Sequence, residues 1–195
     1  MWYNVLQRRF FIMTWENTTV KKILITEEEI IERSKELGAI VTEAYKDNPP
    51  LVVALLRGSV PFLAELIKHI DLNIEYDFMD VSSYVGTESM GDIRILKDLD
   101  TSVKGKDILL VEDIVDTGAT IKEVMGLLQS RGARSVRIIT LLNKQGRRNC
   151  NVKADYIGFE IPDEFVVGYG LDFNQKYRAL PYVGVLKEEC YTSKE

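Results

Sequence analysis

Short runs of aliphatic residues alternate along the chain with segments whose apolar residues recur every three or four positions. The uninterrupted aliphatic run at residues 51–56 indicates a strand buried on both faces, and the runs at residues 108–111 and 136–142 repeat the pattern. Less regular apolar segments predict further strands at residues 20–25, 74–82, 156–159 and 182–186, and strand-like alternation occupies residues 93–99. The chain is therefore rich in short strands that do not follow one another directly.

Helices are predicted between several of these strands. Thr26 and Glu29 have the spacing of a capping box, which marks the start of the first helix. Pro61 stands near the start of the second helix, and Ile121 opens the apolar face of the third. The recurring order of strand and helix predicts an α/β fold with a mainly parallel sheet. In such sheets ligands bind at the carboxyl ends of the strands, so the polar loops that follow the strands are the candidate sites.

One stretch, residues 108–120, carries the strongest functional signal. Its aliphatic run ends in Glu112 and Asp113, and Asp116 and the turn Thr117-Gly118-Ala119-Thr120 lead into the third helix. Free backbone N–H groups and the helix dipole favour an anion at such a helix start, and glycine allows the backbone to approach it closely. The two threonine hydroxyls add donors. The stretch therefore predicts a phosphate site.

Three acidic residues beside a phosphate site require a reason of their own. They fit a ligand that also offers a ribose diol, a magnesium ion, or a cation that develops during a reaction. The structural alternative is an acidic strand end followed by an ordinary capping turn.

Two further loops follow predicted strands. Arg57 and Gly58 come directly after residues 51–56 and form a second candidate anion site, although a solvated arginine at a helix start is the alternative. Residues 143–148 form a cationic loop after the strand at 136–142.

Residues 161–172 combine aromatic residues and glycines, and they suit a wall against a flat ligand, with Asp172 offering a carboxylate. A core segment with turns is the alternative there. Residues 83–91 contain two glycines and small hydroxyl residues, which predict a mobile flap or, alternatively, a hairpin loop. His69 is the only histidine, and we expect it to have a capping or surface role.

Composition narrows the class of protein without identifying it. The length of 195 residues fits one domain. The net charge of -5 argues against broad nucleic-acid binding. Cys150 and Cys190 form no disulfide or metal pattern, so a reduced cytoplasmic setting is expected. No apolar run reaches transmembrane length. Residues 1–12 are expected to be an extension, disordered or a start-site artefact, and residues 13–195 a single domain.

Residues 111–120 resemble the phosphoribosyl-pyrophosphate (PRPP) motif of type I phosphoribosyltransferases. Within that class the chain is similar to the hypoxanthine-guanine phosphoribosyltransferases, especially bacterial ones. The resemblance spans about residues 23–186 and includes these segments: 56–59, 82–84, 94–99, Lys144, 161–172, Asn174, Tyr177 and Arg178. It implies a mainly parallel sheet flanked by helices, with a small hood from the N- and C-terminal segments. The flap departs slightly at residues 85–87 and at Met90.

The resemblance implies transfer of a phosphoribosyl group from PRPP to hypoxanthine or guanine, with Mg²⁺ as cofactor. PRPP would be held by Glu112, Asp113, Asp116, Thr117, Gly118, Ala119 and Thr120. Its pyrophosphate would be held by Arg57, Gly58 and Arg178. The purine would contact Ile114, Lys144, Phe165, Val166 and Asp172.

The resemblance also implies further roles. The metal would be held by Glu112, Asp113 and Asp172, and Asp116 would be the catalytic base. Ser83 and Tyr84 would belong to the flap. A non-proline cis peptide at Leu56–Arg57, no membrane or nucleic-acid partner, and a homodimer or homotetramer are implied as well.

Two rival functions share this pattern. A phosphoribosyltransferase that prefers xanthine would differ only in how it reads the base at C2. A nucleotide-sensing, RNA-binding regulator of the same fold would not need catalysis, although the acidic net charge and the presence of Arg57, Asp116 and Lys144 count against it.

Overall fold

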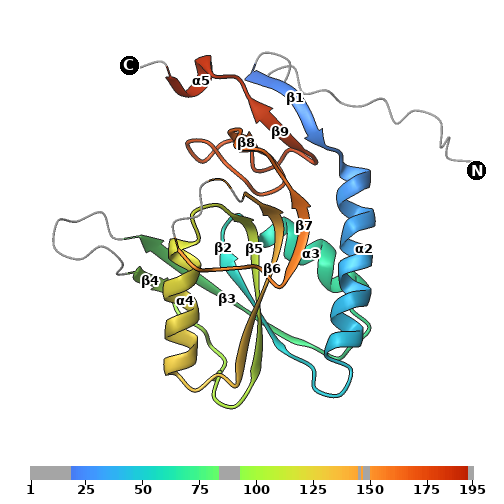
Figure 1. The fold of residues 1–195 in the computed structure, drawn as a ribbon, viewed down its shortest axis with the longest axis vertical. Coiled ribbons are helices and arrows are strands. Elements are labelled where there is room, and N and C mark those ends of the chain that lie inside the picture. Colours follow the sequence, from blue (N-terminus) through green and yellow to red (C-terminus); the bar gives the residue numbers. More distant parts are fainter. Residues whose placement is uncertain (1–18, 84–92, 145, 147–149, 193–195) are drawn as a thin grey trace, which may run out of the picture.

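The part of the chain that the structure, a computed structural model, describes comprises residues 19–83, 93–144, 146 and 150–192. It forms a large sheet flanked by helices and a second, smaller sheet above it (Figure 1). The elements in chain order are β1 (Val20–Ile25), α2 (Glu27–Ala44), β2 (Leu51–Leu56), α3 (Val60–Leu66), the 3₁₀ helix η1 (Ile67–His69), β3 (Glu75–Ser83), β4 (Ile93–Lys97), β5 (Asp107–Val115), α4 (Ala119–Ser130), β6 (Ser135–Asn143), β7 (Tyr156–Glu160), β8 (Val166–Val167), β9 (Val183–Leu186) and α5 (Glu189–Thr192).

The large sheet has the strand order β4-β3-β2-β5-β6-β7. Its strands are parallel except β4, which runs antiparallel to β3. The three aliphatic runs recognised in the sequence are β2, β5 and β6, and they lie side by side at the centre. The prediction of a mainly parallel sheet is confirmed, and its carboxyl ends bring the polar loops to one edge.

Alternate residues of the central strands face two separate cores. Val52 and Ala54 pack with α2 and α3 in one buried cluster. Leu51 and Val53 pack with α4 in the other. A strand whose neighbouring residues are both buried needs apolar residues at every position, which is why β2 shows no polar alternation.

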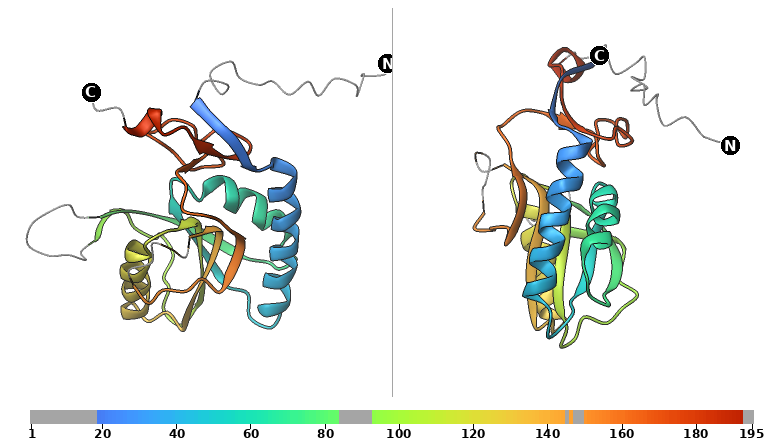
Figure 2. Two further views of the ribbon diagram at one scale, coloured as in Figure 1. Left: turned by 45° about the horizontal axis from the view of Figure 1, so that its top comes forward. Right: turned by 90° about the vertical axis from the view of Figure 1, so that its right-hand side faces the viewer.

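The small sheet has the order β1-β9-β8 and is antiparallel, and it joins segments from near both ends of the described chain. Two further views show the same arrangement, with β1 beside β9 above the large sheet (Figure 2). This sheet is the expected hood. No helix in the described residues has the length and apolar composition needed to cross a membrane.

Helix α2 begins with the predicted capping box. Glu29 donates its N–H to the Thr26 hydroxyl at 3.2 Å, and Thr26 donates its N–H to the Glu29 carboxylate at 2.8 Å. Further along α2, Arg33 donates to the carbonyl oxygens of Ile157 at 2.8 Å and Gly158 at 3.0 Å. The helix is thereby fastened to β7, the terminal strand of the large sheet.

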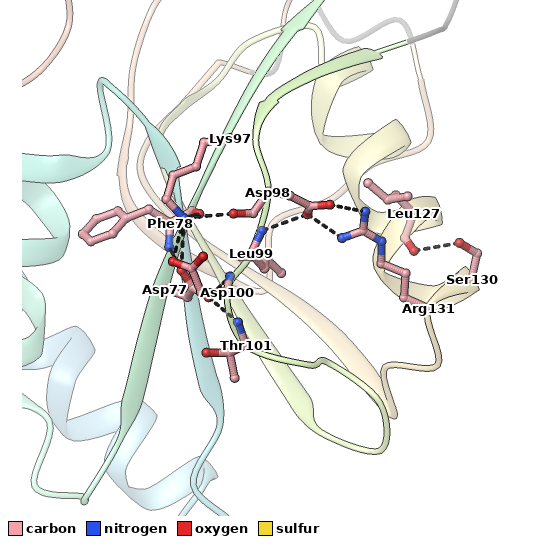
Figure 3. Close-up of polar contacts among 10 residues, drawn as sticks. All are labelled: Asp77, Phe78, Lys97, Asp98, Leu99, Asp100, Thr101, Leu127, Ser130 and Arg131. Atoms are coloured by element: carbon pink, nitrogen blue, oxygen red, sulfur yellow. Dashed lines mark hydrogen bonds and ion pairs between the residues drawn. The ribbon is translucent and has the colours of Figure 1, made fainter.

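A polar network fixes the outer strands of the sheet to the far end of α4 (Figure 3). Asp77 of β3 accepts hydrogen bonds from the N–H groups of Asp100 at 2.8 Å and Thr101 at 2.9 Å. Asp98 pairs with both terminal nitrogens of Arg131, at 2.6 and 2.7 Å. Burial alone would raise the pKa of Asp77, but these N–H groups, that of Phe78 and the charge of Lys97 hold it below its usual value. The end of α4 opposite the candidate phosphate site is therefore held in place.

Several elements differ from their predicted bounds. Strand β5 continues to Val115, so Glu112 and Asp113 lie within the strand and not after it, and Glu112 pairs in register with Thr140 of β6. Strand β8 and helix α5 were not predicted, because two and four residues are too few to show a period. His69 has a local role, since its Nε2 lies 2.9 Å from Glu65 Oε1 on the same turn.

Candidate functional site

The carboxyl end of β5 opens onto a cleft of about 230 Å³. It is lined by these residues: Leu55, Leu56, Val81, Glu112, Ile114, Asp116, Thr117, Gly118, Ala119, Thr120 and Ile121. Most of the residues expected to hold PRPP are therefore brought to one surface, together with Ile114 from the expected purine contacts. Leu55 and Val81 were not expected there.

The turn at the start of α4 has the geometry of an anion site. Gly118 has φ of 80°, a left-handed conformation that favours glycine, and it precedes the first helical residue, Ala119. Lys122 donates its N–H to the Gly118 carbonyl at 3.0 Å, so helical hydrogen bonding begins at this residue. The N–H groups of a first helical turn have no acceptor within the helix and would donate to a phosphate bound there. The Ala119 N–H lies 3.4 Å from Thr117 Oγ1.

Glu112 and Asp113 are adjacent acids, of which Glu112 is buried and Asp113 is partly buried. Burial raises the pKa of Glu112 well above its usual value, and the neighbouring Asp113 raises it further. Burial also raises the pKa of Asp113 to about 6, although the Ile114 N–H and the charge of Arg178 oppose the shift. Buried acids in this state gain from a ligand that supplies hydroxyl donors or a cation.

Two loops and the end of strand β5 meet at Gly58. The Leu56–Arg57 peptide bond is cis, as the resemblance implied. A Cβ atom added to Gly58 would lie 1.6 Å from Asp113 Oδ2, and one added to Gly170 would lie 1.9 Å from the Gly58 carbonyl oxygen. The loop after β2 thus approaches β5 at a distance that only glycine permits, and the loop before β9 approaches the loop after β2 in the same way.

Arg178 and Asp172 form an ion pair of 2.8 Å between Nη2 and Oδ1. Arg178 also donates to the Gly170 carbonyl at 2.7 Å, and the Gln175 N–H donates to Asp172 Oδ2 at 2.9 Å. Tyr169, Asn174, Gln175 and Tyr177 have positive φ, an uncommon concentration that often marks functional loops. This loop brings one cation and one carboxylate beside the Gly58 junction.

Lys144 lies at the end of β6 and is 5% exposed. Its backbone N–H donates to the Val115 carbonyl at 3.0 Å, so its position is tied to the end of β5. Its Nζ lies 3.7 Å from Asp163 Oδ1. Phe165 is 37% exposed and Val166 is buried, and both lie at the hood. The position of Asp163 beside Lys144 was not predicted from the sequence.

The chemistry of these donors suits magnesium bound together with a substrate. Among the described residues, no three histidine, cysteine or acidic side chains come together as a metal-binding group. Mg²⁺ usually keeps several waters and takes one or two carboxylates plus phosphate oxygens. Glu112, Asp113 and Asp172 offer such carboxylates, and a phosphorylated substrate would supply the other oxygens.

Of the residues expected in the flap, the structure describes only the first. Ser83 is the last residue of β3. Tyr84, residues 85–87 and Met90 lie outside the described residues.

Residues 20–174 match the phosphoribosyl transferase domain family, and the chain belongs to that family. It is 60% identical over 173 residues to a hypoxanthine-guanine phosphoribosyltransferase of Lactococcus lactis, covering 88% of this chain and 94% of the relative. It is 54% identical to a protein of the same name from Bacillus subtilis, covering 89% and 97%. A crystal structure of a hypoxanthine phosphoribosyltransferase from Staphylococcus aureus superposes with a TM-score of 0.89 at 49% identity, covering 93% and 100%. The type I phosphoribosyltransferase fold is confirmed.

Proposed function

We propose that this chain is a purine-salvage enzyme that transfers the 5-phosphoribosyl group of PRPP to hypoxanthine or guanine, giving IMP or GMP and pyrophosphate. The observation that carries the proposal is that Glu112, Asp116 and the turn from Thr117 to Thr120 line the same cleft. A helix start for phosphate and buried acids for the ribose and its cation are together what PRPP requires. The relatives' names favour 6-oxopurines as acceptors.

Within this proposal each group has a defined task. The first turn of α4 binds the 5′-phosphate, and Arg57, Gly58 and Arg178 bind the pyrophosphate. Glu112, Asp113 and Asp172 would offer carboxylates to a magnesium ion held mainly by substrate oxygens, and this ion would neutralise charge on the leaving pyrophosphate. Asp116 accepts the N7 proton of the base as N9 attacks C1′.

The base would be selected by residues at the end of β6 and in the hood, together with Ile114 from the cleft. Lys144 donates to the purine O6, and Phe165, Ile114 and the Val166 backbone contact its faces and edge. Adenine presents a donor at position 6, which would leave two donors facing each other, so 6-oxopurines are favoured.

Product analysis tests the proposal directly. The purified protein is incubated with PRPP, Mg²⁺ and each of hypoxanthine, guanine, xanthine and adenine in turn. IMP and GMP are the expected products. A preference for xanthine would assign the rival activity, whereas RNA binding in a gel-shift assay without turnover would support the regulator.

Lys144→Ala is expected to weaken hypoxanthine and guanine alike by about 1–3 kcal/mol, because a buried charged donor to O6 is lost. Purine KM and kcat are measured at saturating PRPP. Lys153→Ala, which removes an exposed lysine, is the control. Unchanged purine kinetics in Lys144→Ala would show that this residue does not read the base.

Gly58→Ala is expected to weaken PRPP binding by about 1.5–3 kcal/mol, because the new Cβ displaces the Asp113 carboxylate and the hydrogen bonds it would accept are lost. Calorimetry with PRPP and Mg²⁺ measures the affinity. Gly126→Ala is the matched control, since no atom lies within 4 Å of its added Cβ and alanine favours the helix by roughly 0.5–1 kcal/mol. Wild-type affinity in Gly58→Ala would mean that Asp113 does not contact PRPP.

Assembly and location form a secondary part of the proposal. We expect a homodimer or homotetramer, the assemblies implied by the family resemblance. Size-exclusion chromatography with light scattering tests the assembly. Free thiols at Cys150 and Cys190 fit the reducing cytoplasm.

A further inference from the structure

Helix α5 places an aromatic side chain on Phe165, the residue proposed to stack on the purine. The rings of Tyr191 and Phe165 have centroids 4.9 Å apart and planes inclined by 21°, which is a stacked pair. Phe173 meets the Phe165 ring edge-on, with centroids 5.6 Å apart and an angle of 88°. One face of Phe165 is thus covered by Tyr191, Phe173 meets the ring at a right angle, and Phe165 remains 37% exposed.

The helix that carries Tyr191 is itself anchored to the hood. Lys187 donates its N–H to the Thr19 carbonyl at 2.9 Å, beside β1. Leu186 donates its N–H to the Phe165 carbonyl at 2.8 Å, so the segment leading into α5 is tied to the backbone of Phe165. Cys190 packs against a buried cluster that includes Val167, Leu180 and Leu186. Tyr191 is therefore held over Phe165 by the anchored residues that precede it in the sequence.

We propose that Tyr191 is a positioning residue for base binding, which fixes the plane of the Phe165 ring so that its other face receives the purine. This proposal rests on the proposed function. An aromatic ring free to rotate would lose orientational freedom when a base stacks on it, and a second ring stacked behind it removes that freedom beforehand. Tyr191 acts through Phe165 and needs no contact with the substrate.

The test compares steady-state kinetics of full-length variants. Tyr191→Leu removes the ring, Tyr191→Phe keeps it, and Phe165→Leu removes the partner. Tyr76→Leu is the matched control, because Tyr76 is also exposed and also meets a phenylalanine, Phe78, at 5.9 Å. KM for hypoxanthine, KM for PRPP, kcat and Tm are measured for each.

Tyr191→Leu is expected to raise the hypoxanthine KM by about three- to tenfold, the range of one aromatic pair, with kcat and the PRPP KM within about twofold of wild type. Tyr191→Phe and Tyr76→Leu are expected to stay within about twofold in every constant. In the Phe165→Leu background, adding Tyr191→Leu is expected to change the hypoxanthine KM by less than about twofold, because the residue through which Tyr191 acts is gone.

Several outcomes would overturn the proposal. A hypoxanthine KM that is unchanged would remove Tyr191 from base binding, and one that falls would show that Tyr191 occupies the face meant for the base. An equal rise in the PRPP KM, or a full effect in the Phe165→Leu background, would indicate a general structural role. If Tyr191→Leu does not fold, Tyr191→Met is judged by the same criteria. If the wild-type protein turns over, any of these variant results contradicts only the role of Tyr191. If the wild-type protein shows no turnover, the proposed function is contradicted as well.

Discussion

Asp116→Asn is expected to lower kcat by about 10²–10⁴-fold, the usual contribution of a general base. The amide keeps the size of the side chain and much of its hydrogen bonding, but it does not accept the N7 proton of the base. Asp116 lines the cleft immediately before the turn that starts α4, whereas Glu112 lies deeper along β5. PRPP affinity should stay within a few-fold, since mainly a transition-state interaction is lost.

The competing role for Asp116 is a structural cap for the turn from Thr117 to Thr120. That role predicts weaker PRPP binding and a lower Tm with kcat nearly intact at saturation. Measuring kcat, PRPP Kd and Tm on one variant separates the two accounts. Asp100→Asn, at a side chain that is 87% exposed, serves as the control. A near-normal kcat at saturating PRPP would remove Asp116 from the catalytic role.

Removal of divalent metal is expected to abolish detectable turnover, and Mg²⁺ or Mn²⁺ should restore it. The raised pKa values of Glu112 and Asp113 show that ionising both carboxyls is unfavourable, and the pyrophosphate adds further negative charge. A cation would therefore be needed to hold the carboxylates and the pyrophosphate together. The assay follows nucleotide formation in excess chelator, with a chelator already saturated with Mg²⁺ as the control. Undiminished activity in excess chelator would contradict the requirement.

Thermal unfolding provides a second measurement for the same prediction. Without PRPP, chelation should leave Tm unchanged, because the described residues form no group of three or more metal-ligating side chains. With PRPP present, Mg²⁺ should raise Tm, since a ligand that binds only the folded protein stabilises it. A large loss of Tm in the absence of PRPP would indicate a structural metal instead.

The sequence predicts those parts of the site that are close together along the chain. Asp116 and the residues from Thr117 to Thr120 share one turn, so connectivity alone keeps them together. Arg57 follows β2 and Lys144 follows β6, the two parallel strands on either side of β5. The rule that ligands bind at carboxyl ends places both at the same edge. The aliphatic runs of the three central strands predict the sheet for the same reason, because each is a local signal.

Contacts between distant segments have no such signal. The close approach of Gly170 to Gly58, the position of Asp163 beside Lys144 and the stacking of Tyr191 on Phe165 each join different loops. The end of β5 was predicted too early, because two acidic residues were taken to end a strand. Pairing with β6 extends it to Val115, where tertiary hydrogen bonds outweigh local propensity.

The contact between Arg33 and β7 bears on how uncontrolled pairing of sheet edges between molecules is avoided. A terminal strand presents backbone groups that are able to pair with a strand of another molecule, which leads to edge-to-edge aggregation. The Arg33 guanidinium occupies the carbonyl oxygens of Ile157 and Gly158. A charged side chain from α2 thus already takes up two carbonyl groups of β7, which disfavours pairing with another strand at those positions.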